Sequence, residues 1–206
     1  MNKLQELYDG STSAADYAAG YIAHMAKVVS SLDPEAVAAI GGIIDDVAAQ
    51  DKTLFLIANG GSAAVSTHWV NDLSANTVVD GKPGYRVISL TDNASSITAL
   101  GNDASFDEIF TIQLKANMRP GDVVLAMSVS GSSPNLVSAI DYGNANGATT
   151  IACVGCDGGK LKTLAKHVIH IESTRDEYGP IEDMFIVIMH IIQSYISMNR
   201  GRYLAH

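Results

Sequence analysis

Five short apolar runs alternate with segments of helical periodicity along most of the chain. The runs are 53–58 (TLFLIA), 85–90 (YRVISL), 122–127 (DVVLAM), 149–154 (TTIACV) and 167–171 (HVIHI). Short apolar runs separated by helices are typical of parallel strands that are buried on both faces of a sheet. The pattern therefore predicts a single three-layer α/β/α sandwich around a five-stranded parallel sheet.

Two amphipathic helices are predicted before the first strand. Apolar residues recur at helical spacing over 13–32 and again over 34–50, where Asp-Pro marks the start of the second helix. We expect one domain over residues 1–206, in which residues 1–50 form N-terminal oligomerisation helices and residues 51–199 form the α/β core.

Composition narrows the classes of ligand and partner. The 206 residues carry 13 Lys+Arg against 22 Asp+Glu, for a net charge of -9, which argues against binding nucleic acid or an anionic membrane by bulk charge. With 47% hydrophobic and 17% charged residues, some apolar surface is expected between subunits. The N-terminus lacks the apolar core of a signal peptide, and no stretch of about 18 uncharged apolar residues occurs, so a cytoplasmic location is expected.

The two cysteines, Cys153 and Cys156, are spaced as C-V-G-C, a gap that also occurs in redox and zinc motifs. Cys153 ends an apolar run that is typical of a buried strand, and no second pair completes a zinc site. A structural role is the favoured interpretation.

The strongest chemical signal is S-V-S-G-S-S-P-N, residues 128–135, between the third strand and the next helix. The hydroxyls of Ser128, Ser130 and Ser133 and the helix N-terminal amides can donate to phosphate oxygens, and Pro134 suits the first helical turn. Such a loop can also serve only as a helix cap. Its neutral donors fit an acidic protein that binds one small phosphate.

A second loop, A-N-G-G-S at 58–62, follows the first strand and predicts a tight turn at Gly60 and Gly61. Two such loops at the carboxyl ends of two parallel strands imply a shared cleft. Neither loop has the Gly-Lys-Ser/Thr of a Walker motif or the GxGxxG of a dinucleotide site, which argues against ATP and NAD.

Together, the N-G-G-S loop, the helix with His68, the G-N-D at 101–103 and the S-x-S-G-x-S loop resemble the sugar isomerase (SIS) domain, most closely the phosphoheptose isomerases. The resemblance runs from about residue 53 to residue 195. It implies a flavodoxin-like fold, a sugar-phosphate ligand, a homotetramer and active sites where subunits meet. It also implies phosphate contacts from Ser128, Val129, Ser130 and Ser133, and sugar contacts from Asn59, Gly60, Gly61, Ser62, Asn102 and Asp103.

The resemblance also places the acid and base. The family's His and Glu, four residues apart on one helix, correspond to His68 and Asp72, and its Gln and His, eight apart on the last helix, correspond to Glu182 and His190. Asp72 would be the base and His190 the acid of an aldose–ketose isomerisation, with Glu182 among the substrate contacts. The carboxylate of Asp72 is one methylene shorter than that of the family's Glu. In the first turn of the last helix, Glu182 would also be favoured by the helix dipole.

Some phosphoheptose isomerases hold zinc on the four matching positions, so the resemblance implies a possible zinc site, one per subunit, at His68, Asp72, Glu182 and His190. Two imidazoles and two carboxylates suit zinc or a related divalent ion. The expected reaction converts sedoheptulose 7-phosphate to a D-glycero-D-manno-heptose 7-phosphate through an enediol, for heptose biosynthesis. Two alternatives stay open: an isomerase of another ketose phosphate, and a non-catalytic SIS module that binds sugar phosphate or a replication initiator.

Overall fold

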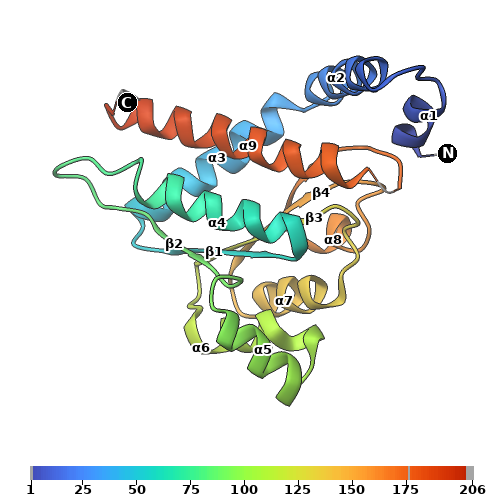
Figure 1. The fold of residues 1–206 in the computed structure, drawn as a ribbon. Helices are drawn as coiled ribbons and strands as arrows, with labels where there is room; N and C mark the ends of the chain where they lie inside the picture. Colours follow the sequence, from blue (N-terminus) through green and yellow to red (C-terminus); the bar gives the residue numbers. More distant parts are fainter. Residues whose placement is uncertain (1, 176, 203–206) are drawn as a thin grey trace.

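The computed structural model describes residues 2–175 and 177–202 (Figure 1). In chain order its elements are α1 (Lys3–Asp9), α2 (Ala14–Ser30), α3 (Pro34–Ala49), β1 (Thr53–Ala58), α4 (Gly60–Ser74), β2 (Arg86–Ser89), α5 (Ala94–Asp103), the 3₁₀ turn η1 (Phe106–Glu108), α6 (Ile109–Asn117), β3 (Val123–Ser128), α7 (Pro134–Ala145), β4 (Thr149–Val154), α8 (Leu161–Leu164), β5 (His167–His170) and α9 (Tyr178–Asn199).

The five strands form one sheet in the order β2-β1-β3-β4-β5, with every neighbouring pair parallel. This confirms the predicted α/β sandwich. The strand order reverses at β1 and β3, which lie side by side although β2 separates them in the chain. Ligands of open parallel sheets bind outside the carboxyl ends of the strands at such a reversal, and the two Gly- and Ser-rich loops leave β1 and β3 there.

Two hydrophobic cores sandwich the sheet because successive side chains of a strand point to opposite faces. In β1, Leu54 and Leu56 pack in the core beneath α3, α4 and α9, whereas Phe55 and Ile57 pack against α6 and α7. Figure 1 shows α3, α4 and α9 above the sheet and α5, α6 and α7 below it. Trp69 of α4 is fully buried in the first core.

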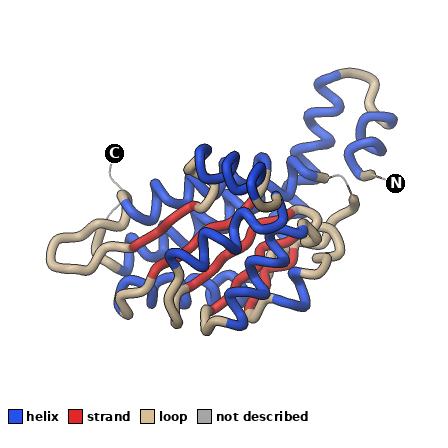
Figure 2. Tube along the Cα trace, turned by 90° about the horizontal axis from the view of Figure 1, so that it is seen from below, coloured by secondary structure: helices blue, strands red, loops and turns tan. Residues whose placement is uncertain are grey.

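The N-terminal helices project from this layered body. Helices α1 and α2 form a hairpin that extends beyond the sheet in two perpendicular views (Figures 1 and 2). Among the described residues of the hairpin only Val28 is buried. The Ser13 hydroxyl accepts from the backbone N–H of Asp16 and so caps α2, whereas α1 was not anticipated.

Helix α9 is the long apolar helix of the core. Among the described residues it is the one helix with the length and hydropathy of a membrane span. Half of its most apolar stretch is nevertheless buried inside the fold. Side chains such as Met184 and Ile188 pack against the sheet. The helix begins at Tyr178, ahead of Pro180, so Glu182 lies in its second turn and the prediction that the helix dipole favours it in the first turn is wrong.

Both cysteines are buried, Cys153 in β4 and Cys156 just after it. Burial raises the pKa of the Cys153 thiol to about 12, so this group stays protonated and unreactive. A structural role for Cys153 fits its place in the central sheet.

Candidate active site

The loops after β1 and β3 meet at the carboxyl edge of the sheet and enclose a cavity of about 240 Å³. Its lining residues are Asn59, Gly60, Gly61, Ser62, Met127, Ser128, Val129, Ser130, Ser133, Leu136, Tyr178 and Glu182. Nine of the eleven residues predicted to bind substrate therefore lie around one cavity. Among the described residues that line it, Glu182 is the one charged side chain, and no Lys or Arg takes part.

The Ser-rich loop is shaped to present hydroxyl donors. The Ser128 oxygen accepts from the backbone N–H of Gly131 at 3.1 Å, and the Ser130 oxygen accepts from the N–H of Ser132 at 3.3 Å. Because each oxygen is used as an acceptor, its O–H remains available to donate to an anion. Pro134 opens α7 directly after the loop, so the free amides of the helix N-terminus point to the same place.

The loop after β4 braces the Ser-rich loop from behind. The backbone N–H of Leu161 donates to the carbonyl of Gly131 at 2.9 Å. A Cβ on Gly131 would collide with the carbonyl of Gly158, and a Cβ on Gly159 would collide with the Ser132 side chain. The sequence showed a Gly-rich turn after the fourth strand, but no local pattern indicated that it packs on a loop almost thirty residues earlier.

Glu182 reaches the cavity from α9. The Ser62 hydroxyl donates to its Oε1 at 3.1 Å. A Cβ at Gly61 would collide with the carboxylate, so glycine there leaves the space that Glu182 occupies. The carboxylate therefore borders the cavity beside the β1–α4 loop.

His68, Asp72 and His190 converge where α4 and α9 lie side by side (Figure 1). Asp72 Oδ2 lies 3.3 Å from His68 Nε2 and 3.5 Å from His190 Nε2, and the two imidazole rings meet edge to face with centroids 5.2 Å apart. Asp72 is buried, while the two His side chains are 43% and 50% exposed. One carboxylate thus faces two imidazoles that solvent or ligand can reach.

The cluster lies apart from the cavity within the chain. Glu182 and His190 are eight residues apart on α9, which is about 12 Å at a rise near 1.5 Å per residue. Ser62 and Asp72 are separated by ten residues of α4 in the same direction. The structure therefore brings three of the four predicted metal ligands together and places Glu182 with the substrate-binding loops.

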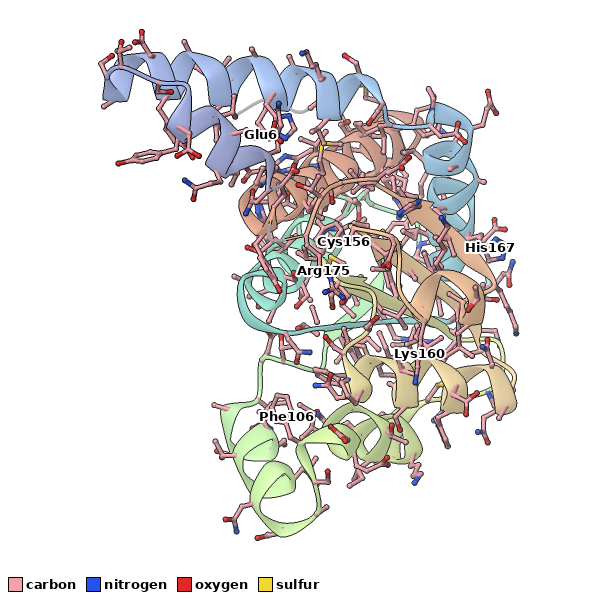
Figure 3. All side chains as sticks on the ribbon, turned by 90° about the vertical axis from the view of Figure 1, so that its right-hand side faces the viewer. Glu6, Phe106, Cys156, Lys160, His167 and Arg175 are labelled. Carbon is pink, nitrogen blue, oxygen red and sulfur yellow. The ribbon has the colours of Figure 1, made fainter. Side chains whose placement is uncertain are left out.

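Asn102 and Asp103 lie elsewhere. Both are exposed on α5, where the Asn102 amide donates to the Asp103 carboxylate at 2.7 Å. Figure 3 shows Phe106, just after α5, at the far end of the molecule from Glu6 on α1. Neither Asn102 nor Asp103 lines the cavity.

Tyr178 is a cavity residue that the sequence did not reveal. It lies one helical turn before Glu182, so both side chains share the face of α9 that borders the cavity. Its side chain is 53% exposed and stands at the rim. No local pattern in the sequence indicated this position.

Comparison with known families identifies this arrangement. The SIS domain family matches residues 16–155, which include both loops and the strands that carry them. The chain belongs to the SIS domain family. A probable phosphoheptose isomerase of Thermoplasma acidophilum is 36% identical over 176 residues, covering 85% of this chain and 95% of that protein. The phosphoheptose isomerase of Citrifermentans bemidjiense is 34% identical over 168 residues, covering 82% and 85%. These relatives identify the chain as an isomerase.

Solved structures agree in fold. A phosphoheptose isomerase from Francisella tularensis superposes with a TM-score of 0.81 at 23% identity, covering 91% of this chain and all of that one. Its counterpart from Neisseria gonorrhoeae gives 0.80 at 24% identity, covering 90% of this chain and all of that one. The SIS fold expected from the sequence is confirmed, including the helices that carry the acid and base candidates.

The three-residue cluster fits a divalent metal ion in its donor chemistry. One ligand atom each from His68, Asp72 and His190 lies within 4.8 Å of the others, and two imidazoles with a carboxylate are a donor set that zinc uses. The half-exposed imidazoles leave room for a further ligand. The same groups equally suit proton transfer without a metal.

Proposed function

We propose that the protein interconverts sedoheptulose 7-phosphate and a D-glycero-D-manno-heptose 7-phosphate through an enediol. Two features together carry this proposal. One is the cavity, whose described lining has serine hydroxyls and no Lys or Arg, and the other is the cluster of His68, Asp72 and His190 further along α4 and α9. A linear ketose phosphate has its phosphate and its reacting carbonyl at opposite ends. Two separate groups of residues are what such a substrate requires.

The Ser-rich loop binds the phosphate through Ser128, Ser130, Ser133 and the backbone of Val129. Asn59, Gly60, Gly61, Ser62 and Glu182 contact the hydroxyls of the sugar, and Asn102 and Asp103 contribute from a neighbouring subunit. Neutral donors suffice because a buried hydrogen bond to a charged oxygen is about twice as strong as one between neutral groups.

Asp72 and His190 move the protons. Asp72 removes a proton from C1 of the ketose, which leaves an enediolate, and returns it to C2 to form the aldose. His190 donates a proton to the oxygen that gains electron density and takes one from the oxygen that becomes the carbonyl. Their contact through Asp72 Oδ2 supports a shared site, since acid and base must both reach adjacent carbons.

A zinc or related divalent ion is proposed at His68, Asp72 and His190, with Glu182 as a further ligand if it comes from a second subunit. When bound, such an ion would supply Lewis acidity at the substrate oxygens. The distance between Glu182 and His190 along one helix is the argument for a ligand set that draws on two subunits.

A homotetramer is proposed as the assembly, in the cytoplasm. A groove of about 620 Å³ runs between α3 and α9 and is lined mainly by apolar residues, and Ile191 and Tyr195 of its lining are 46% and 65% exposed. Another copy of the chain is the proposed occupant. The groove is bordered by α9, the helix that also carries His190, the proposed acid, and Glu182. Light scattering after gel filtration tests it, and a Tyr195→Glu variant should dissociate.

Incubation of the purified protein with sedoheptulose 7-phosphate, followed by NMR of the aldose, tests the reaction. A His190→Asn variant should lose turnover while its affinity for inorganic phosphate stays unchanged, because the imidazole lies away from the cavity. Lack of turnover with divalent metal present contradicts the proposal. A panel of other ketose phosphates tests the alternative substrate.

A further inference from the structure

The two oxygens of the Asp72 carboxylate have different kinds of partner. Oδ1 accepts from the side-chain amides of Asn71 at 2.9 Å and Asn76 at 3.2 Å. Oδ2 faces the imidazoles of His68 and His190 at 3.3 and 3.5 Å. Oδ1 is therefore held by two neutral donors, while Oδ2 remains available to the two histidines and to a ligand bound between them.

Asn76 is itself fixed between α4 and α9. Its backbone N–H donates to the carbonyl of Asp72 at 3.2 Å, and its carbonyl accepts from the Ser197 hydroxyl at 3.3 Å. The Ser197 oxygen in turn accepts from the Gln193 amide at 3.0 Å. Gln193 and Ser197 are 5% and 0% exposed, which is unusual for polar side chains.

This buried polar chain leads along α9 to the reacting groups. Gln193 and Ser197 follow His190 by three and seven residues, so all three lie on one face of the helix. The chain Gln193, Ser197, Asn76 therefore links the helix that carries His190 to the carboxylate on α4. Buried polar chains whose members are all hydrogen-bonded make the local geometry rigid.

We propose that Asn76, held by Ser197 and Gln193 and assisted by Asn71, is a positioning residue that fixes the Asp72 carboxylate for proton transfer and metal binding. A neutral amide restrains the carboxylate without neutralising its charge, as Lys or Arg would. The restraint turns Oδ2 toward both imidazoles. Groups that hydrogen-bond a ligating carboxylate commonly contribute tenfold to a hundredfold to metal affinity or activity.

Asn146 offers a matched control for a purely structural role of Asn76. It follows α7 directly, whereas Asn76 is the second residue after α4, and the amide of Asn146 also bonds the residue four positions earlier, at the carbonyl of Tyr142 (2.8 Å). Asn146 is exposed and belongs to neither the cavity nor the cluster. Replacing Asn146 therefore measures the effect of losing an Asn after a helix, without losing a contact to Asp72.

The experiment compares Asn76→Leu with Asn146→Leu, each in the wild-type and the Asp72→Asn background, by titration with Co²⁺ followed by its visible absorption. We expect Asn76→Leu to weaken Co²⁺ binding by about tenfold or more. Asn146→Leu should have no effect, and in the Asp72→Asn background Asn76→Leu should add no further loss. A kinetic measurement, which rests on the proposed function, should show a lower kcat with the KM for ketose phosphate unchanged.

Equal Co²⁺ affinity and equal kcat for Asn76→Leu and wild type would overturn the proposal, as would the same loss in the Asp72→Asn background. If Asn76→Leu does not fold, Ser197→Ala decides, because it releases the Asn76 carbonyl and should weaken Co²⁺ binding by about threefold to tenfold. A wild-type protein that binds Co²⁺ but does not turn over sugar phosphate would contradict the proposed function alone, since the absorption measurement needs no turnover.

Discussion

The side-chain amides of Asn59 and Asn135 exchange two hydrogen bonds of 2.9 Å, each donating to the oxygen of the other. Asn59 belongs to the loop after β1, and Asn135 to the first turn of α7 after the Ser-rich loop. The pair therefore joins the two loops that line the cavity. Asn135 is 1% exposed and also accepts from the backbone N–H of Leu136, so its side chain is fully engaged.

Replacing Asn135 by leucine should destabilise the protein and widen the cavity. The amide of Asn59 would lose its partner in a half-buried place, which costs about 2 kcal/mol. The KM for sugar phosphate should rise more than kcat falls, because binding loops are displaced while the acid and base are not. Denaturant unfolding and steady-state kinetics measure both. The double variant Asn59→Leu, Asn135→Leu should regain part of the stability, and no recovery would contradict the pairing as its source.

Local sequence patterns were sufficient for the fold and for the loops. Apolar runs predicted all five strands, since burial on both faces of the sheet requires them, and Gly and Ser predicted the loops, since turns and anion binding require those residue types. The pairing of Asn59 with Asn135, the brace from Gly159 and the rim position of Tyr178 were not predictable. These contacts join residues from separate elements, and no local sequence pattern at either residue predicts the other as its partner.

A Gly159→Ala substitution should weaken phosphate binding by disturbing the brace. Its φ is +50, which favours glycine, and a Cβ would collide with Ser132 and the backbone of Gly131. We expect the Kd for inorganic phosphate to rise about tenfold, because a shift near 1 Å misplaces several donors together. Gly84→Ala, at an exposed position with open space around the added Cβ, should leave phosphate binding unchanged. Calorimetric titration with phosphate distinguishes the two, and equal affinities would argue against the brace.

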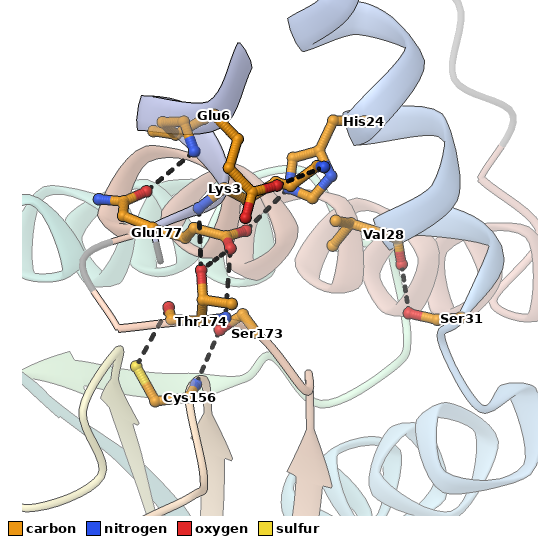
Figure 4. A network of polar contacts seen from close by, with 11 residues as sticks. Lys3, Glu6, His24, Val28, Ser31, Cys156, Ser173, Thr174 and Glu177 are labelled. Carbon is orange, nitrogen blue, oxygen red and sulfur yellow. Dashed lines mark hydrogen bonds and ion pairs between the residues drawn. The ribbon is translucent and has the colours of Figure 1, made fainter. Parts of the chain in front are cut away.

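Glu177 makes the docking of the N-terminal hairpin sensitive to acid. It accepts from His24 of α2 at 2.8 Å and from the backbone N–H of Thr174 at 3.2 Å (Figure 4). Burial alone would raise the pKa of Glu177, but the hydrogen bonds from Thr174 and His24 outweigh it and hold that pKa below its ordinary value of 4.5. A lowered pKa stabilises the fold above the unfolded value and loses that contribution as the pH falls through the folded one.

The melting temperature should therefore fall more steeply below about pH 4.5 in the wild type than in Glu177→Gln. The variant should be less stable at neutral pH, because a neutral amide cannot replace an ionised acceptor for His24 and Thr174. Glu172→Gln is the control and should follow the wild-type curve. Glu172 is exposed and lines the same small pocket as Glu177 and His24. Parallel melting curves for wild type and Glu177→Gln from pH 7 to 3 would contradict the assignment.

Glu182→Gln should strengthen the binding of phosphate, because it removes a negative charge from the cavity. The carboxylate is the only charged group among the described cavity residues, and phosphate enters the same 240 Å³ space. Two like charges at an effective dielectric near 20 repel by about 1 kcal/mol after screening, which is roughly fivefold in affinity. The amide of Gln keeps an acceptor for the Ser62 hydroxyl, so the cavity keeps its shape.

Calorimetric titration with inorganic phosphate at low salt measures the gain. The gain should shrink with added NaCl, since salt screens charge repulsion but not a steric change. Asp183→Asn, one residue along on the exposed side of α9, removes the same charge outside the cavity and should change little. Unchanged phosphate affinity in Glu182→Gln, or a gain of equal size in Asp183→Asn, would show that Glu182 does not act on the ligand through its charge.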